Sequence, residues 1–544
     1  MVETHRLLGE IQNGFRRGRS GADNNFILDT ILWKNSAKKS KTFFAFFDIS
    51  KAYDSVDRNI LWRKLSSLGF GGNFLKTIQS IYTDDSVQCE INGLKTRPIY
   101  LRRGLRQGCS LSPLLFNLYI SSLGHALTLS NLGIKVGRVY IAGLLFADDL
   151  VVIARTKSGL LKLIALVKHH SDALNLNLNT DKNKSEVLAQ TGNEGDTWDL
   201  VDACGATILS LKQVMQYKYL GTQVYTTMAK TVREKLKQCE SKARQYKGSC
   251  ISISHDGPDV VDMIVATWCN IAVPSILFGC EMIPFTDTVI SNIERIQSQV
   301  AKYALGLPSS AANICAQTEL GFKPFRLLLY GTQLHYYNRV LSLSNQRWVK
   351  QAMDDHMSMH WESPYMKYLL KIRTELGLIS LPKDNKLNSA LNTFFINKIN
   401  CDLQSFNLPG VLPIKSFSRQ RYTKECAQSE CIANFRYNIV NIGHRIPRPG
   451  THARQKFCPL CPVQTSNTPI HVAFYCPALE HTRKHLTSIS SFRNMCSAKN
   501  FSEIKICQLF LNGKDWNEVP VDLDVYLERG NDLQAVLDEF NSQW

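Results

Sequence analysis

The chain has 544 residues, of which 44% are hydrophobic, and it carries a formal net charge of +18. The length excludes a single ordinary core, so we expect three or four domains, and the hydrophobic fraction excludes a largely disordered chain. The excess of Lys and Arg favours a polyanionic partner such as nucleic acid.

The N-terminal sequence MVETHRLLGEIQ has no apolar core of the signal-peptide type. We therefore expect the 16 cysteines to be reduced and the protein to be intracellular, not secreted. Residues 263–280 carry no charge and approach the length of a membrane span. Because Pro274 lies inside this stretch, we expect a core helix broken at that proline and no transmembrane segment.

Residues 43–57, FFAFFDISKAYDSVD, predict a buried strand that ends at Asp48. Phe43–Phe47 are apolar on both faces, as in a central strand, and a polar turn follows. This places the Asp48 carboxylate at the rim of a sheet. A helix should come next, with Asp57 as its N-cap and Gly69 at its end.

Residues 143–154, GLLFADDLVVIA, predict a strand, a tight turn and a second strand, with Asp148 and Asp149 at the tip. One interpretation is a solvated turn, because Asp is common in turns. The other is a metal site. With Asp48, three carboxylates would converge, and such hard oxygen ligands suit Mg²⁺. Two ions about 3.5–4 Å apart would serve phosphoryl transfer, which is the chemistry of polymerases.

Several motifs stand in the order found in reverse transcriptases. Asp48 and Tyr53 are followed by RRGLRQGCSLSPLLFNLY and then by FADD. The chain resembles the reverse transcriptases of non-LTR retrotransposons, the long interspersed elements. Further segments are similar to the finger-side motif, the Asn-x-x-Lys-Thr-Lys element, the primer grip and the thumb of that family: residues 12–23, 179–187, 217–221, 272–281 and 293–308.

The resemblance implies an α+β right-hand polymerase with an antiparallel-sheet palm, partial fingers, a helical thumb, a helical connector and a small zinc knuckle. We expect the following division of the chain: fingers and palm in 1–224, thumb in 225–340, connector in 341–414, a basic segment with the knuckle in 415–485, and an acidic tail in 486–544.

The resemblance also implies roles at the acidic site. Asp48, Asp148 and Asp149 would hold two Mg²⁺ ions, and Ile49 would offer its backbone carbonyl. Tyr53 would be an aromatic gate that excludes the ribose 2′-hydroxyl; the alternative is an aromatic packed at a strand–helix corner.

Other segments would contact substrate. Gln107 and Gly108 would touch the template or the incoming nucleotide, and the primer grip would be shaped by Tyr217, Leu220 and Gly221.

Three basic side chains have two interpretations each. Arg16 and Arg19 would hold phosphates, or belong to a solvated basic loop. Lys182 would lie beside the pyrophosphate, or be a plain surface lysine. Asn183 follows it where the family has Thr or Ser, and this departure weakens the assignment.

A second metal site is predicted near the C-terminus. Cys458, Cys461, His471 and Cys476 have the spacing C-x2-C-x9-H-x4-C. Three thiolates and one imidazole would make a closed tetrahedral shell for one Zn²⁺; the alternative is a set of unrelated thiols. Arginines interleaved with aromatic residues precede the cluster, so RNA or target DNA is the expected ligand.

The predicted function is an RNA-directed DNA polymerase that extends a DNA 3′ end, as in target-primed reverse transcription. Its partners would be an RNA template, a DNA primer or target and dNTPs, with no membrane, and its location would be nuclear. The family normally has more finger structure and an endonuclease, neither of which we identify, so a separate endonuclease is a possible partner. The alternative is a truncated, catalytically inactive remnant that binds nucleic acid.

Overall fold

The computed structural model describes residues 7–253, 260–307, 309–359, 363–378, 384–405, 479–481 and 535–536. The chain divides into two compact units. The first comprises Met1–Lys235, Glu281–Pro284 and Tyr336–Lys371, and the second comprises Leu236–Cys280, Phe285–His335 and Ile372–Trp544. The four predicted zinc ligands lie outside the described residues, and so does nearly all of the basic segment around them. The division of the chain by function stays a prediction.

A six-stranded sheet forms the centre of the first unit. Its strand order is β11-β12-β10-β1-β9-β8. In that order the strands are Thr197–Val201, Thr207–Val214, Glu186–Ala189, Phe43–Phe47, Asp149–Ala154 and Gly143–Phe146. Every neighbouring pair is antiparallel except β10 and β12, which run parallel. The predicted antiparallel sheet is therefore corrected to a mixed one.

The central position of β1 follows from its sequence. All five of its residues are buried, as expected for a strand with both faces covered. The helices of this unit are α1 (Gly21–Ala37), α2 (Arg58–Ser67), α3 (Gly72–Ile81), α4 (Ser112–Tyr119), α5 (Ser121–Leu129), α6 (Lys157–Ala173) and α13 (Trp348–Ser358). Helix α6 packs on β1 and β9, and α1 packs on β8. The predicted cap of α2 is confirmed, because the Asp57 carboxylate accepts the backbone N–H groups of Asn59 and Ile60.

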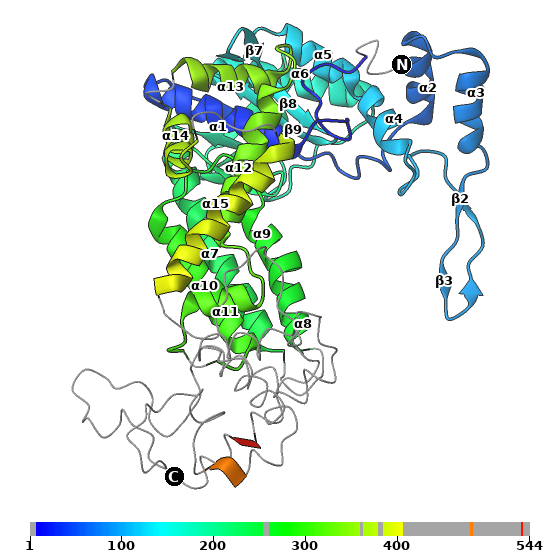
Figure 1. Cartoon of the computed structure of the whole chain (residues 1–544). Coiled ribbons are helices and arrows are strands. Elements are labelled where there is room, and N and C mark those ends of the chain that lie inside the picture. Colours follow the sequence, from blue (N-terminus) through cyan, green and yellow to red (C-terminus); the bar gives the residue numbers. More distant parts are fainter. Residues whose placement is uncertain are drawn as a thin grey trace. The chain divides into compact units, whose positions relative to one another are not determined.

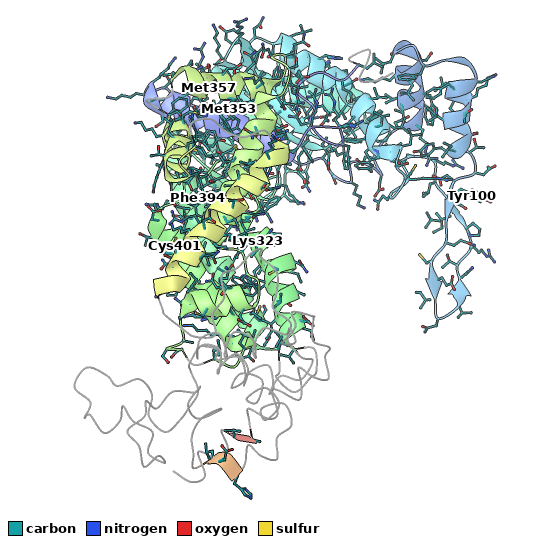
Figure 2. The ribbon with its side chains drawn as sticks, viewed as in Figure 1. Tyr100, Lys323, Met353, Met357, Phe394 and Cys401 are labelled. Carbon is teal, nitrogen blue, oxygen red and sulfur yellow. The ribbon has the colours of Figure 1, made fainter. Side chains whose placement is uncertain are left out.

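Helices α1 and α13 lie side by side although they are far apart in sequence (Figure 1). Figure 2 labels Met353 and Met357 on α13, of which Met353 is fully buried and Met357 is exposed. Residues 336–371 thus contribute to the same unit as the sheet.

Short hairpins complete the first unit. They pair β2 (Ser86–Val87) with β5 (Ile99–Tyr100), β3 (Glu90–Ile91) with β4 (Leu94–Lys95), β6 (Ile134–Val136) with β7 (Val139–Ile141), and β13 (Gln216–Tyr219) with β14 (Thr222–Tyr225). The segment from β2 to β5 forms an extended arm with Tyr100 on its last strand (Figures 1 and 2).

The second unit is helical in its described residues. Its helices are α8 (Val260–Ala266), the π-helix η1 (Thr267–Ala272), α9 (Val273–Leu277), α10 (Asp287–Ala304), α11 (Asn313–Glu319) and α15 (Asp384–Ser405). Helices α7 (Met228–Ile251), α12 (Phe325–Leu341) and α14 (Pro364–Glu375) contain residues of both units. The apolar stripe of α10 is buried as its spacing predicts, at Ile290, Ile293, Ile296, Val300 and Ala304.

The uncharged stretch before α10 is helical as far as Leu277. Val260–Leu277 is long and apolar enough to cross a membrane by length and composition alone, and 39% of it is buried. Its Trp268 is buried and donates its indole N–H to Gln297 Oε1 over 3.1 Å. The break expected at Pro274 is not found: the helix continues through this residue, because the wider turn of η1 directly before it accommodates a residue without an N–H.

Candidate active site

The β8–β9 hairpin carries two of the acids. Phe146 pairs with Asp149, so the turn consists of Ala147 and Asp148. Ala147 has a φ of 56°, in the left-handed region that favours glycine. The predicted strand, turn and strand are thus present, with Asp148 in the turn and Asp149 at the start of β9.

Asp48 directly follows β1, at the end of that strand which lies beside the start of β9. Strands β1 and β9 are antiparallel, and Phe47 pairs with Leu150. Asp48 follows Phe47 directly, and its charge contributes to the raised pKa of Asp149. The backbone of Asp48 is held on both sides, because its N–H donates to Ser185 Oγ over 3.1 Å and its carbonyl accepts from Asn179 N–H over 2.8 Å. The neighbouring Ile49 is buried and bridges to Leu178.

The three acids influence one another electrostatically. Burial raises the pKa of Asp148, and the negative charge of Asp48 raises it further. Loss of hydration raises the pKa of Asp149 to about 6, with further contributions from Asp148 and Asp48. Like charges held together disfavour ionisation, and a bound cation would remove that penalty. Within the described residues, no group of three or more His, Cys, Asp or Glu side chains is placed to hold a metal ion.

Lys184 lies at this cluster, whereas the sequence motif pointed to Lys182. The Lys184 Nζ lies 3.6 Å from Asp48 Oδ1, and its charge lowers the pKa of Asp149. Lys182, the lysine selected from the sequence, is exposed, and no contact with the acids is found for it. The sequence contains a signal that favours Lys184, because the family has Thr or Ser after this lysine. Ser185 follows Lys184, whereas Asn183 follows Lys182.

Tyr53 packs beside the acids. Its ring stacks on Phe116 with centroids 5.0 Å apart and an interplanar angle of 16°. Its hydroxyl is buried without a hydrogen-bond partner, and burial together with the charge of Asp148 raises its pKa to about 12. The packing holds the ring in place, while the orphaned hydroxyl contributes no hydrogen bond to it.

The loop before α4 is exposed at Gln107 and Gly108. Gly108 has a φ of 82°, which suits glycine, and Gln107 Nε2 donates to Asp54 Oδ1 over 3.2 Å. The loop is tied to the segment after β1, because Leu105 N–H donates to the Tyr53 carbonyl over 2.9 Å. It therefore lies beside the turn that carries Tyr53.

The β13–β14 hairpin is joined to the strand that bears Asp48. Leu220 and Gly221 have φ angles of 46° and 77°, the paired left-handed conformations of a tight hairpin turn. The Tyr217 ring stacks on Phe46 with centroids 4.2 Å apart. Its hydroxyl donates to the Lys184 carbonyl over 2.5 Å. Tyr217 of the predicted primer grip is thus linked directly to the backbone of Lys184.

Arg16 and Arg19 are engaged by their own segment. Arg16 is 8% exposed and donates to the carbonyls of Gly9 and Gln12. Arg19 pairs with Glu10 over 2.5 Å, and only 6% of its side chain is exposed. Neither side chain belongs to a solvated loop.

Comparison with known proteins supplies a family for the first part of the chain. Residues 1–224 match the family model described as reverse transcriptase (RNA-dependent DNA polymerase). The retrovirus-related Pol polyprotein of the type-2 retrotransposable element R2DM from Drosophila melanogaster is 30% identical over 221 residues, 40% of this chain and 21% of that protein. The Pol polyprotein of the type-1 retrotransposable element R2 from Nasonia vitripennis is 29% identical over 224 residues, 40% of this chain and 22% of that protein. The chain thus spans about a fifth of the length of these relatives.

Among solved structures, telomerase from Candida albicans, in complex with a fragment of telomeric RNA, is similar with a TM-score of 0.27 and 13% identity. The alignment covers 64% of this chain and 54% of that chain.

Proposed function

We propose that the chain is an RNA-directed DNA polymerase, because residues 1–224 match the reverse transcriptase family model and are similar to the Pol polyproteins of R2 retrotransposable elements. It would extend a DNA 3′ end with dNTPs on an RNA template, as in target-primed reverse transcription. The observation that supports this proposal is the antiparallel register of β1 with β9, in which Phe47 pairs with Leu150, together with the effect of Asp48 and Asp148 on the pKa of Asp149.

The donor set fits divalent cations. Asp48, Asp148 and Asp149 offer carboxylate oxygens, the ligands that Mg²⁺ prefers, and their mutual repulsion would be relieved by bound cations. The backbone carbonyl of Ile49 would complete the set. Two Mg²⁺ ions held there would activate the primer hydroxyl and balance the charge of the triphosphate.

Tyr53 would select the sugar of the incoming nucleotide. Stacking on Phe116 fixes its ring close to Asp148, so a ribose 2′-hydroxyl would meet an immobile surface. Gln107 and Gly108 would contact the nucleotide or template from the exposed loop, where the glycine lets the backbone approach closely.

Lys184 would act on the leaving group. Its ammonium lies next to Asp48, and a cation there can neutralise a departing pyrophosphate or donate a proton to it. Its distance to Asp48 supports Lys184 over Lys182 for this role. Tyr217, Leu220 and Gly221 would hold the primer end, because their hairpin is attached to Phe46 and to the Lys184 backbone.

Arg16 and Arg19 would have a structural role and would not bind phosphates of the substrate. Their hydrogen bonds to Gly9, Gln12 and Glu10 support a structural role, because binding a phosphate would require breaking these contacts.

The C-terminal part would add nucleic-acid binding. Cys458, Cys461, His471 and Cys476 would hold one Zn²⁺ and present RNA or target DNA to the polymerase. A separate endonuclease would supply the DNA 3′ end, and reverse transcription would take place in the nucleus.

The decisive experiment is dNTP incorporation on an RNA template with a DNA primer at varied Mg²⁺ concentration. Asp148→Asn removes one charge at nearly constant volume and should lower incorporation by about 10²-fold or more. Asp199→Asn is the matched control, because Asp199 is an aspartate on β11 of the same sheet. Incorporation that survives Asp148→Asn would reject the mechanism. Absence of incorporation in the parent, with tight and salt-sensitive RNA binding, would identify an inactive binding remnant.

A further inference from the structure

The turn that carries Asp148 contains a strained residue. Ala147 adopts a φ of 56°, where its Cβ crowds the backbone and where most residues other than glycine, Asn and Asp are disfavoured. The direction of the next side chain, Asp148, depends on this conformation. Some contact must therefore hold Ala147, because a relaxed turn would point the carboxylate elsewhere.

Gln12 supplies that contact from a different part of the chain. Its Oε1 accepts the N–H of Ala147 over 2.9 Å, and its Nε2 donates to the carbonyl of Ala147 over 3.2 Å. The same Oε1 accepts the N–H of Gly14 over 2.8 Å. Gln12 is 3% exposed, so water does not compete for these bonds. One side-chain amide thus binds both backbone groups of the strained residue.

The segment around Gln12 is itself fixed against the hairpin. Asn13 N–H donates to the Leu145 carbonyl over 2.9 Å, and Leu145 N–H donates to the Ile11 carbonyl over 2.8 Å. A Cβ on Gly14 would lie 2.2 Å from the Ala147 nitrogen, so only glycine permits this approach. Gln12 is therefore held in place before it binds the turn.

We propose that Gln12 is a positioning residue that holds Ala147 in its left-handed conformation and so sets the direction of the Asp148 carboxylate. Gln12 acts through the backbone of the turn and contacts no substrate atom. Its effect on turnover rests on the proposed function, but its effect on the turn and on cation binding does not.

The test replaces Gln12 with Met, which keeps the length of the side chain and removes its hydrogen bonds. Gln190→Met is the matched control. Gln190 also binds two backbone groups of the first unit, Thr42 N–H over 3.1 Å and the Thr226 carbonyl over 2.8 Å, but neither belongs to the acid hairpin. The readouts are hydrogen exchange of the amides in residues 143–150, Mn²⁺ binding by the full chain, and steady-state incorporation.

Gln12→Met should accelerate exchange at the turn, weaken Mn²⁺ binding about 10-fold, and lower kcat on the order of 10- to 100-fold with little change in the KM for dNTP. Gln190→Met should change none of these. Adding Ala147→Gly to Gln12→Met should recover most of the Mn²⁺ affinity, because glycine adopts the turn without help. Loss of packing alone would not be rescued in this way.

Unchanged exchange and Mn²⁺ binding in a folded Gln12→Met protein would overturn the proposal. If that variant does not fold, Gln12→Asn keeps an uncharged amide but shortens its reach to Ala147, so it should also weaken Mn²⁺ binding, and no effect would again overturn the proposal. A loosened turn with weaker Mn²⁺ binding, in a chain whose parent incorporates no dNTP, would support positioning by Gln12 and reject the polymerase.

Discussion

Lys184 sets the charge balance of the acid cluster. Its ammonium is the positive group that lowers the pKa of Asp149, while Asp148 and Asp48 raise it. Lys182, two residues earlier, is exposed and does not influence these acids in the structure. Because Lys182 and Lys184 carry the same side chain, substituting each in turn tests whether position relative to the acids decides the effect.

Lys184→Gln should reduce kcat on the order of 10²-fold, because a general acid or a neutralising cation would be lost from the leaving group. Lys182→Gln should leave kcat within a small factor of the parent. Single-turnover incorporation with both variants measures the difference. An equal loss in both, or a loss only in Lys182→Gln, would return the role to Lys182.

Substitutions of Tyr53 distinguish a role in packing against Phe116 from a role in selecting dNTPs over rNTPs. The Tyr53 hydroxyl has no partner, so Tyr53→Phe should leave both thermal stability and the dNTP-to-rNTP ratio close to those of the parent. Tyr53→Ala removes the ring from Phe116 and should raise the relative use of rNTPs. Competition between dATP and ATP measures this ratio. A Tyr53→Ala protein that is merely less stable, with the ratio unchanged, would leave Tyr53 as a packed aromatic.

At the scale of elements, α1 connects the sheet to α13. His356 of α13 stacks on Trp33 and Phe26 of α1, with ring centroids 4.5 and 5.2 Å apart. Its ring nitrogens lie 3.0 Å from Thr30 Oγ1 and 2.7 Å from Ser363 Oγ. Asp23, also on α1, is fully buried and pairs with Arg339 and Arg347. Removing one partner of such a buried pair leaves an uncompensated charge, so these contacts hold the two segments together.

The α1–α13 contact should weaken in acid. Burial lowers the pKa of His356 from 6.5 to about 4, with smaller opposing effects of Asp355 and Lys34; Tyr365 also packs against its ring. Below pH 6.5 His356 takes up a proton in the unfolded chain but stays neutral in the folded chain. The free energy of unfolding that is present above pH 6.5 is therefore lost progressively as pH falls toward 4. The loss by pH 5 should be about 2 kcal/mol.

Urea unfolding at pH 7 and pH 5 measures this loss. In His356→Gln, which cannot take up a proton, the difference between the two pH values should shrink by about that amount. An unchanged pH dependence in this variant would contradict the assignment to His356.

At the scale of the whole molecule, the net charge of +18 suits a chain that binds nucleic acid through more than one part. The match to the reverse transcriptase family model covers residues 1–224, and the four clustered Cys and His residues lie far beyond it in sequence. Metal content therefore tests the C-terminal part independently of polymerase activity.

The purified chain should contain one zinc ion, which Cys461→Ser should abolish or greatly weaken because a closed site needs all four ligands. Cys401→Ser is the control, since Cys401 is an exposed thiol on α15 (Figure 2). The zinc content per chain is measured after dialysis in the parent and in both variants. Equal zinc content in both variants, or none in the parent, would remove the knuckle.

Local features of this protein were determined by the sequence itself. The all-apolar run of β1, the hairpin with its acids, the Asp57 cap of α2 and the buried stripe of α10 could all be predicted. Each depends on residues within a few positions of one another, through side-chain periodicity, capping and turn chemistry.

Other features were decided only by the tertiary structure. The approach of Lys184 to Asp48 and the binding of Gln12 to the acid turn join segments far apart in the chain, and β12 pairs in parallel with β10 although β11 lies between them in sequence. Such contacts depend on strand register and on which segments pack together. A shift of a single residue in register moves a side chain to the opposite face, and no local pattern specifies that choice.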